Sequence, residues 1–454
     1  MSLSNSLHTR DIAAHIHPQT DMRKHEAQGP MIIESGDGVH VIDSEGRRYI
    51  EGVSGLWCAS LGFSNRRLAD AAHAQLIKLP YQQTFAHRSN TPAIELAEKL
   101  LALAPVPMSK VMFQNSGSEA VDTAIKFVWY YNAARGLPDK RKILSRVKSY
   151  HGTSVASASL TGLPNMHKGW GLPLDGFVQV ESPHYWRNAL PGETEAAFAA
   201  RLADSFEALI LREGPETIGA FFAEPVMGTG GVILPPADYL DRLQAICRKY
   251  DILIVADEVI CGFGRTGQYW GCQTVGLTPD MLTCAKGLSA AYFPISALMV
   301  NDKVYQVLAD RSAELGGFGQ GYTYGGHPVG AAVALETLKI YDEIDIVVTV
   351  RARQDQMQDG LRAFSDHPLV GEVRGIGLMG AVELVADKAT KAAFATPGLT
   401  GARVAAATAE RGVLLRALGD TLIVAPPLIV SEAELATILA ALSQSLDVAL
   451  NAAA

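Results

Sequence analysis

The chain alternates short apolar runs with amphipathic stretches from about residue 90 to residue 300. The runs are rich in β-branched residues and have the length of buried strands, whereas the stretches between them have helical spacing. The expected strands are 111–114, 142–145, 219–223, 253–256, 281–284 and 296–300, and the helices between them include 93–103 and 239–250. Repetition of this kind is typical of βαβ units, so the sequence predicts an α/β fold with a large, doubly wound and mostly parallel sheet.

Shorter elements flank this core on both sides. A turn cluster between two alternating runs at 39–50 indicates a hairpin, and a helix over 328–342 leads to a series of short strands and a terminal helix. The expected short strands are 377–384, 413–417 and 421–425. Because no second βαβ series follows, we expect a smaller α+β domain built from both chain ends. The predicted division is an N-terminal segment that joins the small domain, 1–63, a large domain, 64–330, and a C-terminal small domain, 331–454.

Composition narrows the class of protein. A length of 454 residues is too great for one simple core, and 48% hydrophobic with 19% charged residues is ordinary for a globular enzyme. The formal net charge of −8 argues against binding of nucleic acid or of an anionic membrane, so small molecules are the expected partners.

The cysteines and the N-terminus bear on the compartment. The five cysteines form no C-x-x-C pair, so we expect free thiols in a reducing compartment and no metal site. The N-terminus lacks the apolar stretch of a signal peptide, and no later segment is expected to be long and apolar enough to span a bilayer. The sequence therefore predicts a cytoplasmic protein.

Two polar residues stand at the carboxyl ends of expected buried strands, about one βαβ unit apart. Asp257 follows the strand 253–256, and Lys286 follows the strand 281–284. Open parallel sheets bind ligands at this edge, so the amine and the carboxylate are expected to meet there. Pyridoxal phosphate requires such a pair, a lysine for its Schiff base and an acid for its pyridine nitrogen. We therefore expect a pyridoxal-phosphate enzyme.

A phosphate site is expected beside this pair. Ser116, Gly117 and Ser118 follow the strand 111–114 and open a helix. Glycine permits close approach, and a helix N-terminus offers free N–H groups and the positive end of its dipole. The alternative is that a serine merely caps the helix, and only the coincidence with Lys286 favours a phosphate.

Two further strand ends carry groups that suit the same cofactor. Tyr150 and His151 follow the strand 142–145, where an aromatic ring can stack on a flat pyridine ring, and Glu224 ends the strand 219–223. The alternatives are an ordinary core tyrosine and a solvated loop carboxylate.

Two other features allow opposite interpretations. The segment 262–267, GFGRTG, has the spacing of a dinucleotide-binding loop, but it opens no clear helix and its acidic neighbour precedes it, so a nicotinamide site is not expected. Arg416 lies in an alternating run before a Gly-Asp turn. It either blunts an edge strand or forms a guanidinium fork for a substrate carboxylate.

The motifs together closely resemble the class III aminotransferases of pyridoxal-phosphate fold type I. The resemblance rests on the segments 116–120, 150–152, 257–267, 285–287 and 322–328. Within that class, the segments 55–58 and 415–420 together with Phe85 resemble ω-aminotransferases that use amines and pyruvate. The resemblance covers essentially the whole chain.

The resemblance implies a role for each residue of the cofactor site. Lys286 would form the Schiff base and shuttle the proton, and Asp257 would keep the pyridine nitrogen protonated. Val259 and Tyr150 would pack on opposite faces of the ring. The phosphate would be held by Gly117 and Ser118 and, from the partner subunit, by Thr323. The implied assembly is an obligate homodimer or a dimer of dimers. The whole expected cofactor site is Ser116, Gly117, Ser118, Tyr150, His151, Glu224, Asp257, Val259, Lys286 and Thr323.

The resemblance also implies a substrate pocket. Arg416 would enter for a carboxylate and swing out for a bulky apolar group, and Trp57 and Phe85 would form apolar walls, with Phe85 from the partner chain; core packing is the alternative for both aromatics. Where several relatives have an aromatic residue, this chain has Gln19. A more polar wall there favours diamines or ω-amino acids over aryl-alkyl amines.

The implied reaction is transfer of an amino group from an amine or ω-amino acid to a 2-oxo acid, expected to be pyruvate, by a ping-pong mechanism. Related chains with the same cofactor act as aminomutases, racemases or decarboxylating transaminases, and these stay alternatives. A non-catalytic binding protein is the alternative from another class, and an intact Lys286 and Asp257 argue against it.

Overall fold

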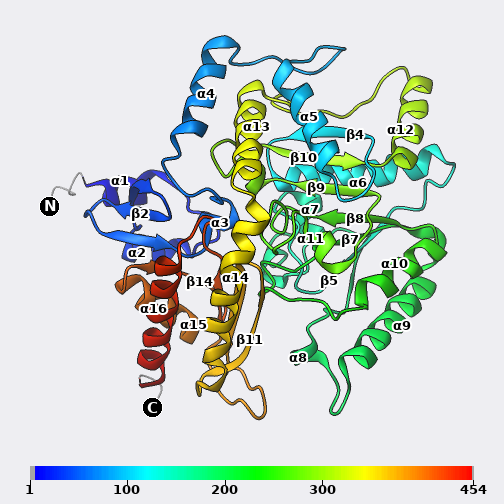
Figure 1. Ribbon diagram of the computed structural model, residues 1–454. Helices are drawn as coiled ribbons and strands as arrows, with labels where there is room; N and C mark the ends of the chain where they lie inside the picture. Colours follow the sequence, from blue (N-terminus) through cyan, green and yellow to red (C-terminus); the bar gives the residue numbers. More distant parts are fainter. Residues whose placement is uncertain (1–5, 452–454) are drawn as a thin grey trace.

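The computed structural model describes residues 6–451 and contains three sheets. The largest has seven strands, and the two others have four each. Figure 1 shows the large sheet with its helices on one side of the molecule and the smaller sheets, together with both chain ends, on the other. The helix α13, Pro328–Glu343, runs between the two parts and continues toward α14, Ile346–Arg362.

The large sheet has the order β4-β10-β9-β8-β7-β5-β6, and only β10 runs against its neighbours. Its strands are β4 Lys110–Gln114, β5 Lys142–Arg146, β6 Phe177–Val180, β7 Ile218–Ala223, β8 Leu253–Asp257, β9 Met281–Cys284 and β10 Ser296–Val300. The six strands expected from the sequence coincide with observed strands to within one residue at each end. The seventh, β6, was missed because it is a short, half-buried edge strand interrupted by Gln179.

Helices cover both faces of this sheet, because successive strand residues point to opposite sides. In β7, Ala220 and Phe222 pack on one face with α6, Gly117–Ala134, whereas Phe221 and Ala223 pack on the other face in the cluster that holds α9 and α10. The nearly continuous apolar runs are thus explained by burial on both faces. The doubly wound α/β prediction is confirmed.

The smaller sheets bring the two chain ends together. One sheet has the order β11-β12-β15-β14, and the other joins the N-terminal strands β1, β2 and β3 to β13, which runs parallel to β3. Their strands are β1 Ile33–Asp37, β2 His40–Asp43, β3 Arg48–Glu51, β11 Val370–Ile376, β12 Met379–Leu384, β13 Val413–Leu414, β14 Arg416–Leu418 and β15 Thr421–Val424. The hairpin expected at 39–50 is β2–β3. The domain boundaries at residues 63 and 330 stay predictions.

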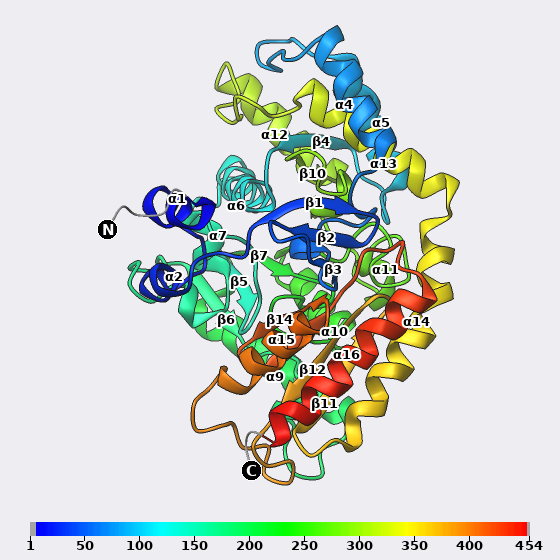
Figure 2. The same cartoon turned by 90° about the vertical axis from the view of Figure 1, so that its left-hand side faces the viewer.

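Helices α14, α15 and α16 lie together on the small sheets, as the view in Figure 2 shows. The remaining helices are α1 Leu7–Ala14, α2 Met22–Gln28, α3 Ser54–Trp57, α4 Arg66–Lys78, α5 Thr91–Leu103, α7 Val155–Leu160, α8 Tyr185–Asn188, α9 Glu195–Glu213, α10 Tyr239–Lys249, α11 Gly271–Val275, α12 Asp302–Glu314, α15 Leu399–Glu410 and α16 Glu432–Asn451.

One expectation about the C-terminal helix is wrong. No segment was expected to be long and apolar enough to span a bilayer, but α16 meets both criteria over its 20 residues. Its apolar side is used within the fold: Leu435, Ile438, Leu442 and Leu446 are completely buried, and the helix packs on α14 and α15. Burial of these side chains explains the apolar composition of the helix.

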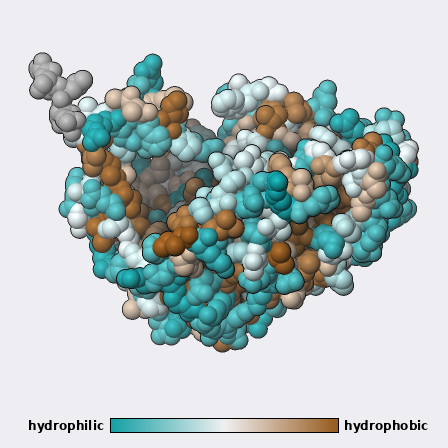
Figure 3. Space-filling view, turned by 90° about the horizontal axis from the view of Figure 1, so that it is seen from above, coloured by the Kyte–Doolittle hydropathy of each residue, from teal (hydrophilic) through white to brown (hydrophobic). Residues whose placement is uncertain are grey.

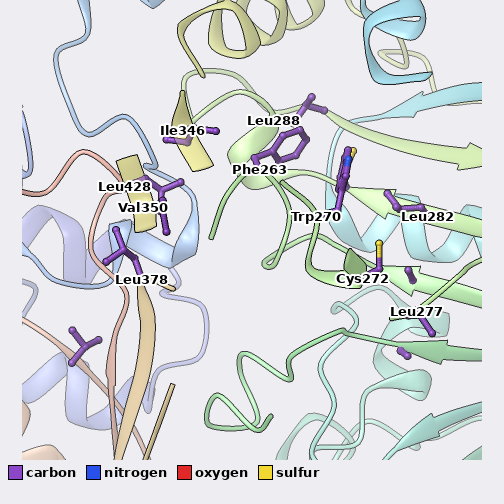
Figure 4. Packing of buried hydrophobic residues seen from close by; sticks show 14 of the residues in the cluster. Phe263, Trp270, Cys272, Leu277, Leu282, Leu288, Ile346, Val350, Leu378 and Leu428 are labelled. Carbon is purple, nitrogen blue, oxygen red and sulfur yellow. The ribbon is translucent and has the colours of Figure 1, made fainter. Parts of the chain in front are cut away.

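The two parts of the molecule share one hydrophobic core. Figure 4 shows Phe263 between Trp270 on the side of the large sheet and Ile346 and Val350 of α14 on the other side. The Phe263 and Trp270 ring centroids are 4.9 Å apart. Because no solvent layer separates the two parts at this point, the small sheets are held in a fixed position over the edge of the large one.

Candidate active site

The carboxyl ends of five strands of the large sheet meet at one pocket. Strand β4 leads to the start of α6, β5 to Tyr150, β7 to Glu224, β8 to Asp257 and β9 to Lys286. The pocket is lined by Gly117, Ser118, Tyr150, His151, Gly152, Glu224, Asp257, Val259, Ile260 and Lys286. Most residues of the expected cofactor site therefore lie together, as the strand-end rule requires.

Asp257 is a buried carboxylate held by three donors. Its Oδ2 lies 2.8 Å from Nδ1 of His151, and its Oδ1 accepts from the backbone N–H of Val259 at 3.1 Å and from the Thr283 hydroxyl at 3.3 Å. Only 4% of Asp257 is exposed. These contacts fix the orientation of the carboxylate within the pocket. Thr283 was not expected from the sequence, although the alternation of β9 places its side chain beside the end of β8.

Lys286 begins a short 3₁₀ turn, Lys286–Leu288, directly after β9. Its φ of +46° lies in the left-handed region, which a lysine rarely adopts, so the surrounding structure holds it there. The Tyr341 hydroxyl contributes by donating to the Gly287 carbonyl at 2.7 Å. Burial lowers the pKa of Lys286, and the charges of Asp257 and Glu224 oppose that shift. A lowered pKa increases the fraction of neutral, nucleophilic amine.

The start of α6 forms another wall of the pocket. Ser116 is exposed and caps the helix, its Oγ accepting from the N–H of Glu119 at 3.2 Å, and it does not line the pocket. Gly117 and Ser118 do line it. A Cβ on Gly117 would lie 2.9 Å from Cγ1 of Val259, so glycine allows this close approach. The capping interpretation thus describes Ser116, whereas the next two residues present the helix N-terminus to the pocket.

Glu224 is not a solvated loop charge, since only 3% of it is exposed. Its carboxylate accepts from the backbone N–H of Tyr150 at 2.9 Å and from that of Gly228 at 3.0 Å. Burial raises the pKa of Glu224. The residue ties the loop after β5 to the loop after β7 and so positions Tyr150 at the pocket, where this tyrosine remains half-buried.

Arg416 stands on β14, an edge strand of its sheet, and its side chain is half-buried. Burial lowers the pKa of Arg416, and Tyr150 is the one charge partner that raises it. No carboxylate of residues 6–451 forms an ion pair with this guanidinium. An arginine partly withdrawn from water without an acidic partner, near a pocket tyrosine, suits an anionic ligand better than a purely structural role.

Two other expected substrate residues do not line this pocket. Trp57 is 3% exposed and packs in a cluster with Val226, Ile260 and Ile423, so it stands behind Ile260, which does line the pocket. Gln19 is exposed, with Nε2 3.4 Å from Sδ of Met166. Ile260 was not singled out from the sequence, because an apolar residue after a strand gives no distinctive signal.

Phe85 and Thr323 lie together, away from the pocket of their own chain. Phe85 is 46% exposed and packs on Gly321, and the Tyr81 hydroxyl donates to the Thr323 carbonyl at 2.8 Å. Neither residue lines the pocket. Their neighbouring, exposed positions are those required if both act in the pocket of a partner chain.

The segment 262–267 is a buried turn that joins the two parts of the molecule. Arg265 donates to the carbonyls of Leu378 and Pro426, at 2.9 and 2.6 Å, and is 2% exposed. Its glycines serve this close packing, which argues against a dinucleotide loop.

The donor set of the pocket fits pyridoxal phosphate. The pocket contains an amine on Lys286, a fixed buried carboxylate on Asp257 and a helix N-terminus at Gly117. These match an aldehyde, a pyridine nitrogen and a phosphate. The Nε2 atom of His151 is buried without a hydrogen-bond partner among residues 6–451, so the pocket also retains one unsatisfied polar atom.

Comparison with known proteins agrees with this fit. The family model "Aminotransferase class-III" matches residues 22–446. A gamma aminobutyrate transaminase of Solanum lycopersicum is 49% identical over 407 residues, which are 89% of this chain and 79% of the relative. The structure of the omega transaminase from Pseudomonas jessenii in complex with PMP superposes with a TM-score of 0.97 at 52% identity, covering 98% of each chain.

An engineered, thermostable omega transaminase has the same TM-score of 0.97 and 52% identity, with 98% of this chain and 99% of that chain covered. That variant has one tryptophan, one phenylalanine and one arginine substituted and was engineered for asymmetric synthesis of enantiopure bulky amines.

Proposed function

Because the chain belongs to the class III aminotransferases, which transfer amino groups with pyridoxal phosphate, we propose that it moves the amino group of an amine or ω-amino acid to pyruvate by a ping-pong mechanism. The observation that carries this proposal is the convergence of Lys286 and Asp257 in one pocket, with Arg416 unpaired nearby. Bound pyridoxal phosphate supplies an aldehyde carbon and an electron-withdrawing ring for this chemistry.

The residues of the pocket divide the work. Lys286 Nζ attaches the cofactor and then moves the proton at the substrate carbon. The Asp257 carboxylate holds a proton on the ring nitrogen, and His151 keeps that carboxylate in place through the 2.8 Å contact. Tyr150 and Val259 enclose the ring from its two faces. The N–H groups at the start of α6, at Gly117 and Ser118, bind the phosphate.

The substrate side explains how one pocket accepts two different substrates. Arg416 binds the carboxylate of pyruvate through its guanidinium, and without an acidic partner it is free to turn away when the donor has no carboxylate. Ile260 and, behind it, Trp57 form the apolar wall. Support for involvement of a tryptophan, a phenylalanine and an arginine comes from the substitutions of the engineered omega transaminase.

The donor is proposed to be an ω-amino acid or a diamine. The polar Gln19 in the N-terminal segment and the likeness to a gamma aminobutyrate transaminase support this choice. Rates with β-alanine, putrescine, taurine and 1-phenylethylamine test it, and a clear preference for the aryl amine contradicts it.

The active form is proposed to be a homodimer. Exposed apolar side chains cluster on α4 and on the two loops that carry Phe85 and Thr323, which is unusual for a surface left in water. They are Leu76, Ile77, Leu79, Tyr81, Phe85, Leu315, Phe318 and Tyr324. The face seen from above in Figure 3 is hollowed, and hydrophobic residues gather along its rim. Sedimentation analysis should give twice the mass of one chain, and a monomer with full activity would contradict the proposal.

A cytoplasmic location is also proposed, since all five cysteines are free and four of them are buried.

The decisive experiment for the reaction measures alanine formed from pyruvate by the holoenzyme with each amine donor. Lys286→Ala should abolish it, because no other amine lines the pocket within residues 6–451. Lys303→Ala, a change on α12 at a side chain 51% exposed, is the matched control and should leave the rate unchanged. Alanine formation by Lys286→Ala at the rate of the unaltered chain would refute the assignment.

A further inference from the structure

A second cluster of ligating side chains lies in the N-terminal segment, outside the candidate active site. Three histidines surround the carboxylate of Asp11. His15 Nδ1 is 3.2 Å from Oδ1, and His17 Nε2 and His25 Nε2 are 2.8 and 3.1 Å from Oδ2. The ring centroids of His17 and His25 are 4.1 Å apart, and those of His15 and His17 are 4.6 Å apart. Three imidazoles thus crowd around one carboxylate.

Local structure brings these residues together from three elements. Asp11 stands on α1, and His15 is the residue that ends this helix, one turn later. His17 lies in the connection to α2, and His25 is on α2 itself with 10% of its side chain exposed. One ligand atom from each of Asp11, His15 and His17 lies within 4.8 Å of the other two. These atoms are therefore close enough for one ion to reach all of them.

We propose that Asp11, His15, His17 and His25 bind one divalent transition-metal ion, with zinc as the best match. Zinc takes four ligands in tetrahedral arrangement, and imidazole nitrogen with a carboxylate oxygen is among its usual donor sets. Calcium and magnesium prefer sites made of oxygen atoms, so a site with three nitrogens disfavours them. In this structure the nitrogens contact the carboxylate, and the ion would take its place between them with small side-chain movements.

Another candidate cluster in the described chain lacks this capacity. His184, Glu372 and Glu383 are similarly close together, but Arg374 lies 2.6 Å from Glu383 and Arg187 lies 2.7 Å from the same side chain. Two guanidinium groups already neutralise these carboxylates. At the N-terminal cluster, by contrast, the contacts to Asp11 come from imidazoles, which are metal ligands in their neutral form.

Metal binding would join α1, the connection and α2 at one point. Gln19 lies in that connection between His17 and His25, with a φ of +54°. An ion held on both sides of this loop would restrict its motion. The site is separate from Lys286 and its pocket, so metal binding is measurable whether or not the proposed reaction is correct.

Calorimetric titration of the tag-free holoenzyme with zinc chloride tests the proposal. The buffer contains no phosphate, and its pH lies above the ordinary imidazole pKa of about 6.5. We expect one zinc ion per chain, and at least about tenfold weaker binding by His17→Ala and by Asp11→Asn. His73→Ala, which removes an exposed histidine on α4, is the matched control and should bind as the unaltered chain does. Absence of binding, or equal binding by all four proteins, would overturn the proposal.

Limited digestion with trypsin gives an independent readout. Arg23 is 89% exposed on α2, between His17 and His25, and is the cleavage site to follow. Zinc should slow cleavage after Arg23 in the unaltered chain and in His73→Ala, because the ion resists opening of α2 from α1. It should have no such effect in His17→Ala. Equal protection of His17→Ala would place the ion elsewhere and refute the site.

Discussion

The two sides of the candidate active site are built in different ways. The cofactor side consists of residues at the ends of neighbouring strands of one sheet, and its charged group Asp257 is fixed by three donors. The substrate side comes from the N-terminal segment, the small sheets and exposed loops, and its charged group Arg416 has no ionic partner among residues 6–451. The difference suggests that the first side performs one unchanging task, whereas the second adapts to two substrates.

The largest effect is expected where the fixed side loses its charge. Asp257→Asn keeps the shape of the side chain but removes the negative charge that holds a proton on the ring nitrogen. Both half-reactions should slow by roughly 100- to 1000-fold, as for loss of one preorganised electrostatic group. Stopped-flow rates with the amine donor and with pyruvate measure this.

Thr283→Val is the matched control for that change, because it removes only the 3.3 Å contact to Asp257. A net neutral hydrogen bond contributes about 1 kcal/mol, so its loss should slow both half-reactions by about tenfold at most. If Asp257→Asn were no slower than Thr283→Val, the carboxylate would have no special task.

A smaller effect is expected from crowding the fixed side. Gly117→Ala places a Cβ 2.9 Å from Cγ1 of Val259, and overpacking of this kind costs about 1–3 kcal/mol. We expect the cofactor to be retained about tenfold less tightly. Equilibrium dialysis measures the loss.

The second variant, Val259→Ala in the same chain as Gly117→Ala, makes room for the new methyl group. Cofactor affinity should then recover most of the loss, although Val259→Ala alone removes a ring contact. Failure of the double variant to improve on Gly117→Ala would mean that the close approach to Val259 is not what limits the site.

The smallest effect is expected on the adaptable side. Gln19→Phe replaces a polar wall by an aromatic one, and single pocket contacts of this kind change selectivity by about tenfold. The ratio of kcat/KM for 1-phenylethylamine to that for β-alanine should rise, with the pyruvate half-reaction unchanged. A constant ratio would remove Gln19 from the pocket and leave it a surface residue.

The fixed side is largely predictable from the sequence, because its rules are local. Alternating burial on two faces identifies the strands, and the chain direction then places the residues after them at one edge. These two rules are enough to predict that Asp257 and Lys286 lie together. They do not single out Thr283, because every second residue of a strand buried on both faces looks alike.

The adaptable side is less predictable for a physical reason. The burial of Trp57 behind Ile260 depends on contacts between distant segments, which no local period encodes. The positions of Phe85 and Thr323 acquire meaning only with a second chain. Ser116 was assigned to the phosphate, whereas its hydroxyl caps α6, since capping and phosphate binding share one sequence signature.

The contrast between the two sides is tested most directly by Arg416→Ala, measured separately in each half-reaction. Loss of a bidentate, charge-assisted contact should lower kcat/KM for pyruvate by roughly 100-fold, whereas an amine donor without a carboxylate should react within about threefold of the unaltered rate. Equal losses in both half-reactions would contradict this, because Arg416 would then support the edge strand β14 rather than bind the substrate carboxylate.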